Sequence, residues 1–126
     1  MNVPDELRYS SDHEWVRVEG DKIRIGITDY AQDALGDVVF VQVPEPGQSL
    51  DSGATFGEVE STKSVSEIYA PIAGTVLEVN ADLEASPELV NSDPYGAGWI
   101  AIVTPADASA TESLMDAAAY RQLTDG

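Results

Sequence analysis

The chain has 126 residues and a hydrophobic fraction of 43%, which suits one globular domain with one modest core over residues 1–126. Its 23 Asp and Glu side chains outnumber its 6 Lys and Arg side chains, so the formal net charge is −17. Such a surface repels nucleic acid phosphates and anionic lipids, and we expect neither nucleic acid nor a membrane as a partner. Because the sequence has no cysteine, disulfides, thiolate metal sites and cysteine nucleophiles are excluded.

The apolar runs and the N-terminal residues of the chain bear on its localisation, and its lysine content bears on its source. No apolar run is long enough to cross a bilayer, and the short acidic start has neither a signal-peptide nor a transit-peptide pattern, so we expect a cytoplasmic protein. Lysine occurs only at Lys22 and Lys63 in this strongly acidic chain. The balance resembles proteins from organisms whose very salty cytoplasm screens self-repulsion, and it favours a halophilic archaeon as the source. An ordinary acidic protein with an extreme charge balance is the alternative.

The first predicted elements form a β-hairpin. Residues 14–18 and 22–27 alternate apolar and polar side chains, which is the period of half-buried strands. Glu19-Gly20-Asp21 between them is typical of a tight turn. This regular alternation also argues against an intrinsically disordered acidic chain, which would lack it.

A short helix and further strands follow the hairpin. Thr28 predicts an N-cap, Asp29 suits the first helical turn, and the helix should run through Leu35 and end before Gly36. Gly, Pro, Asn and Asp then separate several short segments rich in β-branched and aromatic side chains. These segments predict strands at residues 37–43, 55–60, 65–69, 74–79 and 99–103. Many short strands at this spacing are typical of a sandwich or barrel.

The end of the chain has a different composition from residue 105 onward. Strong helix formers follow Thr111, which can cap a helix over residues 111–120. We expect this helix to dock on the sheet through one apolar face made by Leu114, Met115, Ala118 and Leu123.

Lys63 is the most informative single residue. It lies in a polar break of small residues between two alternating segments, where a hairpin tip is expected. A lysine at a hairpin tip extends into solvent, so a modifying enzyme can reach it and an attached group can swing between distant sites. A solvated charge, or a local pair with Glu58, Glu60 or Glu67, would explain the same lysine, and position alone leaves these alternatives open.

Four separate sequence blocks match one family and occur in the same order as in that family. In chain order they are His13-Glu14-Trp15-Val16; residues 26–32 with 35–41; Glu60-Ser61-Thr62-Lys63-Ser64-Val65-Ser66-Glu67-Ile68 with Ala70-Pro71-Ile72-Ala73-Gly74; and Asp93-Pro94-Tyr95-Gly96 with Gly98-Trp99. In these blocks the chain resembles the glycine cleavage H proteins, and the block around Lys63 is similar to their lipoylation segment. The similarity runs from residue 7 to residue 120, with Thr62 in place of the expected valine and Ala97 where an acidic residue is common.

The resemblance implies a fold and a cofactor. The fold would be mainly β, a lipoyl-domain-like barrel-sandwich hybrid of two small antiparallel sheets with a short internal helix and a C-terminal helix. Residues 22–104 would form the lipoyl-binding core and residues 105–126 the C-terminal helical tail. Lipoate would be attached through an amide to Lys63. The chain would be a carrier rather than an enzyme, without catalytic residues and without a metal site.

The resemblance also implies the partners. A pyridoxal-phosphate glycine decarboxylase (P protein) would load an aminomethyl group on the lipoyl arm, and an aminomethyltransferase (T protein) would pass the one-carbon unit to tetrahydrofolate. Dihydrolipoamide dehydrogenase (L protein) would reoxidise the arm, and a lipoate-attaching enzyme would install it. The hard chemistry would belong to the cofactors of these enzymes, and the carrier would present and protect the arm. We expect the carrier itself to be a monomer.

Protection of the loaded arm points to carboxylates. The loaded arm ends in an ammonium, so a sheltering groove should offer carboxylates and exclude water. The candidates are Glu14, which lies beside Trp15, and Glu67, which lies four residues after Lys63. Asp12, directly before His13, adds a carboxylate near the expected groove. Solvated surface acids are the alternative for each. His13 is the only histidine, and with no recognisable nucleophile beside it a packing role is favoured over a general base.

Two alternatives keep the lipoyl group and change the client. One is a lipoate relay protein, which donates its lipoyl group to other carriers. The other is a lipoyl domain serving a 2-oxoacid dehydrogenase, which usually has Asp-Lys-Ala at the tip. A biotin carrier would show Met-Lys-Met, which is absent here. From a different class, a structural or inhibitory binding protein would not need Lys63 to be modified.

Overall fold

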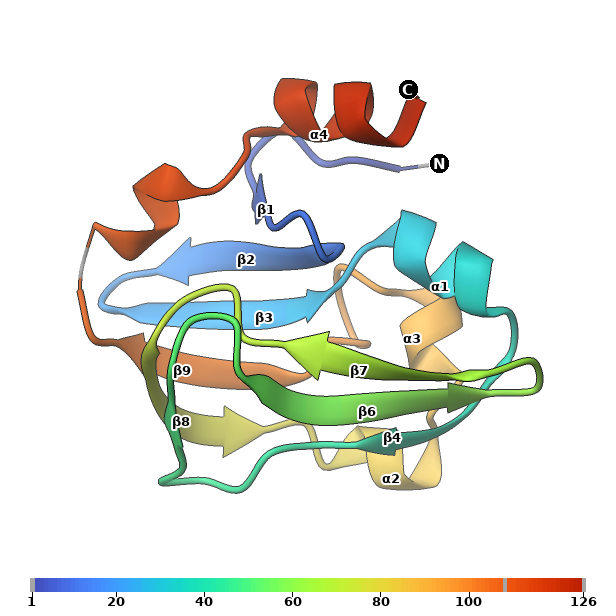
Figure 1. The fold of residues 1–126 in the computed structure, drawn as a ribbon. Helices are drawn as coiled ribbons and strands as arrows, with labels where there is room; N and C mark the ends of the chain where they lie inside the picture. The colour runs from blue at the N-terminus through green and yellow to red at the C-terminus, as the bar shows by residue number, and fades with distance from the viewer. Residues whose placement is uncertain (1, 108, 126) are drawn as a thin grey trace.

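The computed structural model describes residues 2–107 and 109–125, which form two antiparallel sheets with helices at the margins (Figure 1). The larger sheet has the order β1-β2-β3-β9-β8-β5 and the smaller has the order β4-β6-β7. The strands are β1 (Arg8–Tyr9), β2 (Glu14–Glu19), β3 (Lys22–Ile27), β4 (Val38–Gln42), β5 (Ser49–Leu50), β6 (Thr55–Ser61), β7 (Val65–Tyr69), β8 (Gly74–Val79) and β9 (Ala101–Pro105). The helices are α1 (Asp29–Leu35), α2 (Asp82–Ala85), α3 (Leu89–Ser92), the 3₁₀ turn η1 (Ala110–Ser113) and α4 (Ala117–Asp125).

The predicted fold class is confirmed: the protein is mainly β, with two antiparallel sheets, short helices and a C-terminal helix. The bounds of β3, β7 and β8 are those that the alternating pattern predicts, whereas β9 begins at Ala101, two residues later than expected. Strands β1 and β5 have two residues each, too few for a periodic pattern to reveal them. Within the described residues, no helix has both the length and the apolar character that crossing a membrane requires.

Helix α1 follows its predicted caps. The Thr28 hydroxyl accepts a hydrogen bond from the backbone N–H of Ala31 at 3.1 Å, and Asp29 lies in the first turn. Gly36 ends the helix with a φ of 82°, and its N–H donates to the carbonyl of Gln32. A residue with a side chain is strained at that φ, so the glycine sets where the helix stops.

Two apolar clusters hold the molecule together. The main core lies between the two sheets and contains Ile25 and Val103 from the larger sheet and Val41, Val59 and Ile68 from the smaller. The second cluster joins both ends of the chain to the outer strands of the larger sheet, and it consists of Val3, Leu7, Tyr9, Trp15, Ala117 and Tyr120. Figure 1 accordingly shows α4 beside the N-terminal segment, where Arg121 donates to the carbonyl of Val3.

The prediction of one helix over residues 111–120 is wrong. The 3₁₀ turn η1 ends at Ser113, and an extended segment follows in which Met115 exchanges two backbone hydrogen bonds with Tyr9. This pairing withholds the backbone of residue 115 from a helix, so α4 begins only at Ala117. The predicted apolar face is only partly right. Leu114 and Met115 pack against the two cores but precede α4, whereas Ala118 and Leu123 are exposed and Ala117 and Tyr120 are the buried residues of α4.

Gly26→Ala should lower the free energy of unfolding by about 1–3 kcal/mol, the usual cost of overpacking a core. Gly26 lies opposite Trp15 in the β2–β3 pair, and a Cβ there would lie 2.7 Å from the indole. The indole is buried and its N–H donates to the carbonyl of Pro94 at 2.9 Å, so it cannot yield freely. Chemical denaturation measures the loss. The same substitution should cost less beside Trp15→Phe, and an equal cost in both backgrounds would contradict the clash.

Candidate functional site

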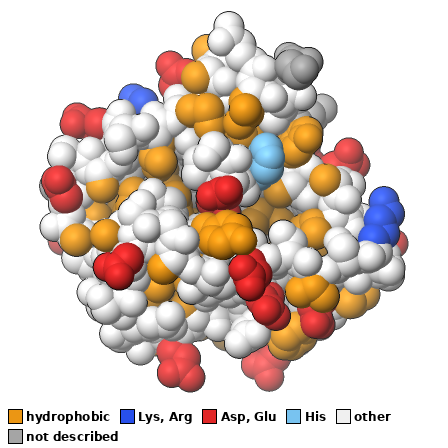
Figure 2. All heavy atoms as spheres, viewed as in Figure 1, with side chains coloured by type: hydrophobic (Ala, Val, Ile, Leu, Met, Phe, Trp, Pro, Cys, Tyr) orange, Lys and Arg blue, Asp and Glu red, His pale blue; other side chains and the backbone are white. Residues whose placement is uncertain are grey.

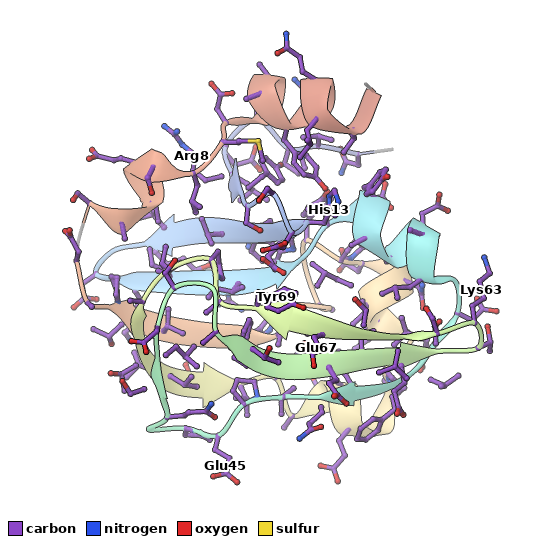
Figure 3. All side chains as sticks on the ribbon, in the orientation of Figure 1. Arg8, His13, Glu45, Lys63, Glu67 and Tyr69 are labelled. Carbon is purple, nitrogen blue, oxygen red and sulfur yellow. The ribbon has the colours of Figure 1, made fainter. Side chains whose placement is uncertain are left out.

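Lys63 lies at the tip of the β6–β7 hairpin, which projects from the body of the protein (Figure 3). Ser61 organises the tip, since its hydroxyl accepts from the backbone N–H groups of Lys63 and Ser64, both at 3.1 Å. The N–H of Thr62 donates to the carbonyl of Asp37 at 3.0 Å and ties the tip to the segment after α1. The lysine is thus exposed on a braced turn rather than on a loose loop.

The side chain of Lys63 passes over Gly36, the residue that ends α1. A Cβ placed on Gly36 would lie 3.2 Å from Cε of Lys63, so the missing side chain leaves room for the lysine stem. No carboxylate of the described residues lies within ion-pair distance of the Lys63 ammonium. A local pair with Glu58, Glu60 or Glu67 therefore does not account for this lysine.

A groove of about 340 Å³ begins beside Lys63 and leads towards the β1–β2 turn. One wall is α1, the opposite end is the turn that carries Asp12 and His13, and the hairpin supplies the third side. The lining residues are Asp12, His13, Tyr30, Ala31, Ala34, Leu35, Ser64, Val65 and Ser66. In Figure 2 the histidine stands at the edge of a hollow in which hydrophobic atoms show.

Glu14 follows the groove residue His13 in the chain and is buried, with 2% of its surface exposed, but it is not among the residues that line the groove. Ser10 donates to its carboxylate at 2.6 Å, and the backbone N–H of Tyr69 donates at 3.3 Å. Burial raises the pKa of Glu14 to about 7, although these two hydrogen bonds oppose the shift. No Lys, Arg or His in the described part of the chain forms an ion pair with it. Glu14 is therefore a buried acid without a cationic partner, which is the environment that a cationic ligand would complete.

Glu67 lies elsewhere on the hairpin and does not line the groove. It is exposed on β7, and its carboxylate accepts hydrogen bonds from the hydroxyls of Tyr69 at 3.2 Å and Thr55 at 3.3 Å. Figure 3 shows Glu67 and Tyr69 on the strand, well back from Lys63 at the tip. Neither predicted carboxylate lines the groove itself, but each follows a lining residue in the chain, Glu14 after His13 and Glu67 after Ser66.

His13 adopts a backbone φ of 70°, in the left-handed region, and its ring packs on Tyr30 with centroids 4.6 Å apart. Its Nδ1 lies 2.8 Å from the hydroxyl of Tyr120, and burial lowers its pKa. These contacts fit the packing role favoured from sequence. The partners Ser10, Tyr30 and Tyr120 were not predicted, because nothing in their sequence positions relates them to Glu14 or His13.

Comparison with known proteins shows the family to which the chain belongs. The family model described as glycine cleavage H-protein matches residues 7–126. The glycine cleavage system H protein of Mycobacterium avium (strain 104) is 62% identical over 125 residues, covering 95% of each chain, and that of Bacillus subtilis (strain 168) is 56% identical over 124 residues, covering 98% of each. A crystal structure of the H protein from Mycobacterium marinum superposes with a TM-score of 0.90 at 41% identity, covering 98% of this chain and 100% of that one. The chain belongs to the glycine cleavage H-protein family, whose members are non-catalytic carriers with lipoate attached covalently to a lysine.

Proposed function

We propose that Lys63 is the lysine that carries the lipoyl arm, and that the groove lined by His13, the neighbour of Glu14 in the chain, shelters the loaded arm. The observation that carries this proposal is the position of Lys63 on a braced hairpin tip at the entrance of that groove. The residues fit the group, because the Lys63 amine is exposed and Gly36 leaves space along the lysine stem. Lipoate supplies a disulfide that accepts and releases the one-carbon cargo, while this chain acts as the shuttle of the glycine cleavage system.

Within this proposal the α1 wall of the groove and the carboxylate of Glu14 have different physical roles. The apolar wall of α1 removes water from the cargo, and Glu14 provides the negative charge for its ammonium end. An ammonium near the carboxylate would favour its ionised form, so we expect Glu14 to release a proton when the cargo binds. Glu67 remains a second candidate, which the geometry supports less because its carboxylate is exposed and already accepts two hydroxyl hydrogen bonds.

Membership of the family implies interaction with the P, T and L proteins. We further propose that the carrier works as a monomer in the cytoplasm. Residues 22–104 would form the arm-bearing core, with residues 105–126 as its tail. We also propose that a lipoate-attaching enzyme modifies Lys63. The braced hairpin supports the modification of Lys63, because an enzyme that must reach one amine needs that amine held away from the rest of the surface.

The attachment site can be tested directly. Protein incubated with lipoate, ATP and a lipoate–protein ligase should gain one lipoyl group by intact mass, and peptide mapping should place it on Lys63. Lys22 is also exposed and serves as an internal control, since it should stay unmodified. A lipoyl group on Lys22, or none at all, would refute the assignment.

We propose that the acidic surface is an adaptation to high salt; the bacterial relatives above do not support an archaeal source. The melting temperature at pH 7 should rise strongly from dilute buffer to molar KCl, because salt screens repulsion within a chain of net charge −17. Near the isoelectric point of about 4.1 this net charge vanishes, and the gain should be much smaller. A melting temperature that does not change with salt at pH 7 would count against the adaptation.

A further inference from the structure

Tyr120 of α4 lies behind the groove and contacts two of its sides. The side chain is fully buried, and its hydroxyl lies 2.8 Å from Nδ1 of His13 and 2.8 Å from the hydroxyl of Thr28. Thr28 caps α1, which forms one wall, and His13 stands at the end of the groove. One hydroxyl group therefore joins the turn that carries His13 to the first turn of α1.

His13 depends on such contacts because its backbone is strained. A φ of 70° is uncommon for a residue with a side chain and costs free energy that the surroundings must offset. The His13 backbone carbonyl accepts from the N–H of Thr28 at 3.0 Å, and the Tyr120 hydroxyl holds the ring. Without that hydroxyl, the His13 ring would keep its packing on Tyr30 and an edge contact with the ring at position 120, but it would lose its hydrogen bond.

The hydroxyl suits this link in either protonation state of His13. It can donate to a neutral Nδ1 while it accepts from Thr28, or accept from a protonated Nδ1 while it donates to Thr28. Burial raises the pKa of the Tyr120 hydroxyl to about 12, so the hydroxyl keeps its proton at neutral pH. A phenylalanine ring would fill the same space but could make neither bond.

We propose that Tyr120 is a positioning residue of the carrier: through His13 and Thr28 it sets the shape of the groove that shelters the loaded arm. This inference rests on the proposed function of the groove. It gives the C-terminal helix a role in the shuttle, because the hydroxyl that joins His13 to Thr28 comes from α4.

Tyr120→Phe is the test, and Tyr9→Phe is its matched control. Tyr9 is fully buried in the same cluster and stacks on Tyr120 with ring centroids 4.6 Å apart, but its hydroxyl donates to the carbonyl of Pro4, away from the groove. Both variants lose a buried hydroxyl and keep the ring. Ammonia release from the loaded carrier without the T protein should accelerate about threefold to tenfold in Tyr120→Phe, as the loss of a buried hydrogen bond predicts, and stay within about twofold in Tyr9→Phe.

A second readout needs no lipoate. His13 is the only histidine, so its ring protons give one set of NMR signals, whose shifts report the ring of Tyr30 beside it. These signals should move or broaden in Tyr120→Phe and remain in place in Tyr9→Phe. Release rates and His13 signals that change equally in the two variants would show a general loss of packing and overturn the proposal. Unchanged values in Tyr120→Phe would do the same.

The two readouts also separate this inference from the function on which it rests. If wild-type protein carried no lipoyl group or did not slow ammonia release, the proposed function of the groove would fail. If the wild-type protein did slow ammonia release and Tyr120→Phe left the release rate unchanged, the inference alone would fail. All rates are to be measured well below the melting temperature of the less stable variant, so that unfolding does not contribute.

Discussion

Lys63→Arg should abolish both lipoylation and carrier activity. Lipoate attachment needs an amine that can lose its proton and attack an activated carboxyl group, and a guanidinium with a pKa above about 12 does not provide one. Arginine keeps the positive charge and the long stem, and the residue is exposed, so the fold should not change. Intact mass after treatment with the ligase measures modification. Glycine-dependent reduction of NAD⁺ in a system reconstituted with the P, T and L proteins measures activity.

The matched control is Lys22→Arg. Lys22 begins β3, and the β2–β3 turn lies at the opposite end of the molecule from the tip of the β6–β7 hairpin (Figure 1). This variant should be lipoylated and active like wild type. Full activity of Lys63→Arg, or loss of activity in Lys22→Arg alone, would move the attachment site away from the hairpin.

Glu14→Gln should shorten the lifetime of the loaded carrier by about tenfold. A charge-assisted hydrogen bond is worth roughly 1.5–3 kcal/mol, and about 1.4 kcal/mol corresponds to a factor of ten when decay requires the arm to leave the groove. Glutamine keeps the size of the side chain and one acceptor for Ser10, so lipoylation of Lys63 should persist. Ammonia release from loaded protein without the T protein measures the lifetime.

The control for the lifetime is Glu67→Gln. Glu67, the second candidate, is exposed, so solvent should screen its charge and the loss of that charge should matter much less. If Glu14→Gln and wild type released ammonia at the same rate, Glu14 would have no role in sheltering. Glu67 and Asp12, of which Asp12 lines the groove, would then be the next carboxylates to examine.

The same variant should also change how stability depends on pH. Burial raises the pKa of Glu14 from its ordinary 4.5 to about 7 in the folded protein. Because the pKa of this carboxyl group is higher in the folded state, its contribution to the free energy of unfolding is fully present below pH 4.5. The contribution is lost as the pH rises through about 7. Wild type should therefore lose up to about 3 kcal/mol relative to Glu14→Gln across that window. Denaturation of both proteins near pH 5 and pH 8 checks the sign, and parallel pH profiles would contradict it.

Local features of the chain were predictable from its sequence. The bounds of α1 follow from Thr28 and Gly36, because a hydroxyl N-cap and a glycine with positive φ act within a few residues of themselves. The β2–β3 and β6–β7 hairpins follow from alternation around a short turn, and Lys63 stands at a tip for the same reason. The family blocks added the expectation of a lipoyl group, which no periodic pattern contains.

Contacts between distant residues were decided only by the tertiary structure. The pairing of Tyr9 with Met115 breaks the helix that local propensity favours in the tail, because two long-range backbone hydrogen bonds compete with the helical ones. The sequence makes Glu14 a candidate among 23 acids but does not show its burial, which arises in the folded protein, where the backbone N–H of Tyr69 donates to its carboxylate. The hydroxyl of Tyr120 reaches His13 across 107 positions, a separation at which no sequence pattern carries geometric information. Sequence therefore determined the tip that presents Lys63, whereas long-range packing determined the groove beside it.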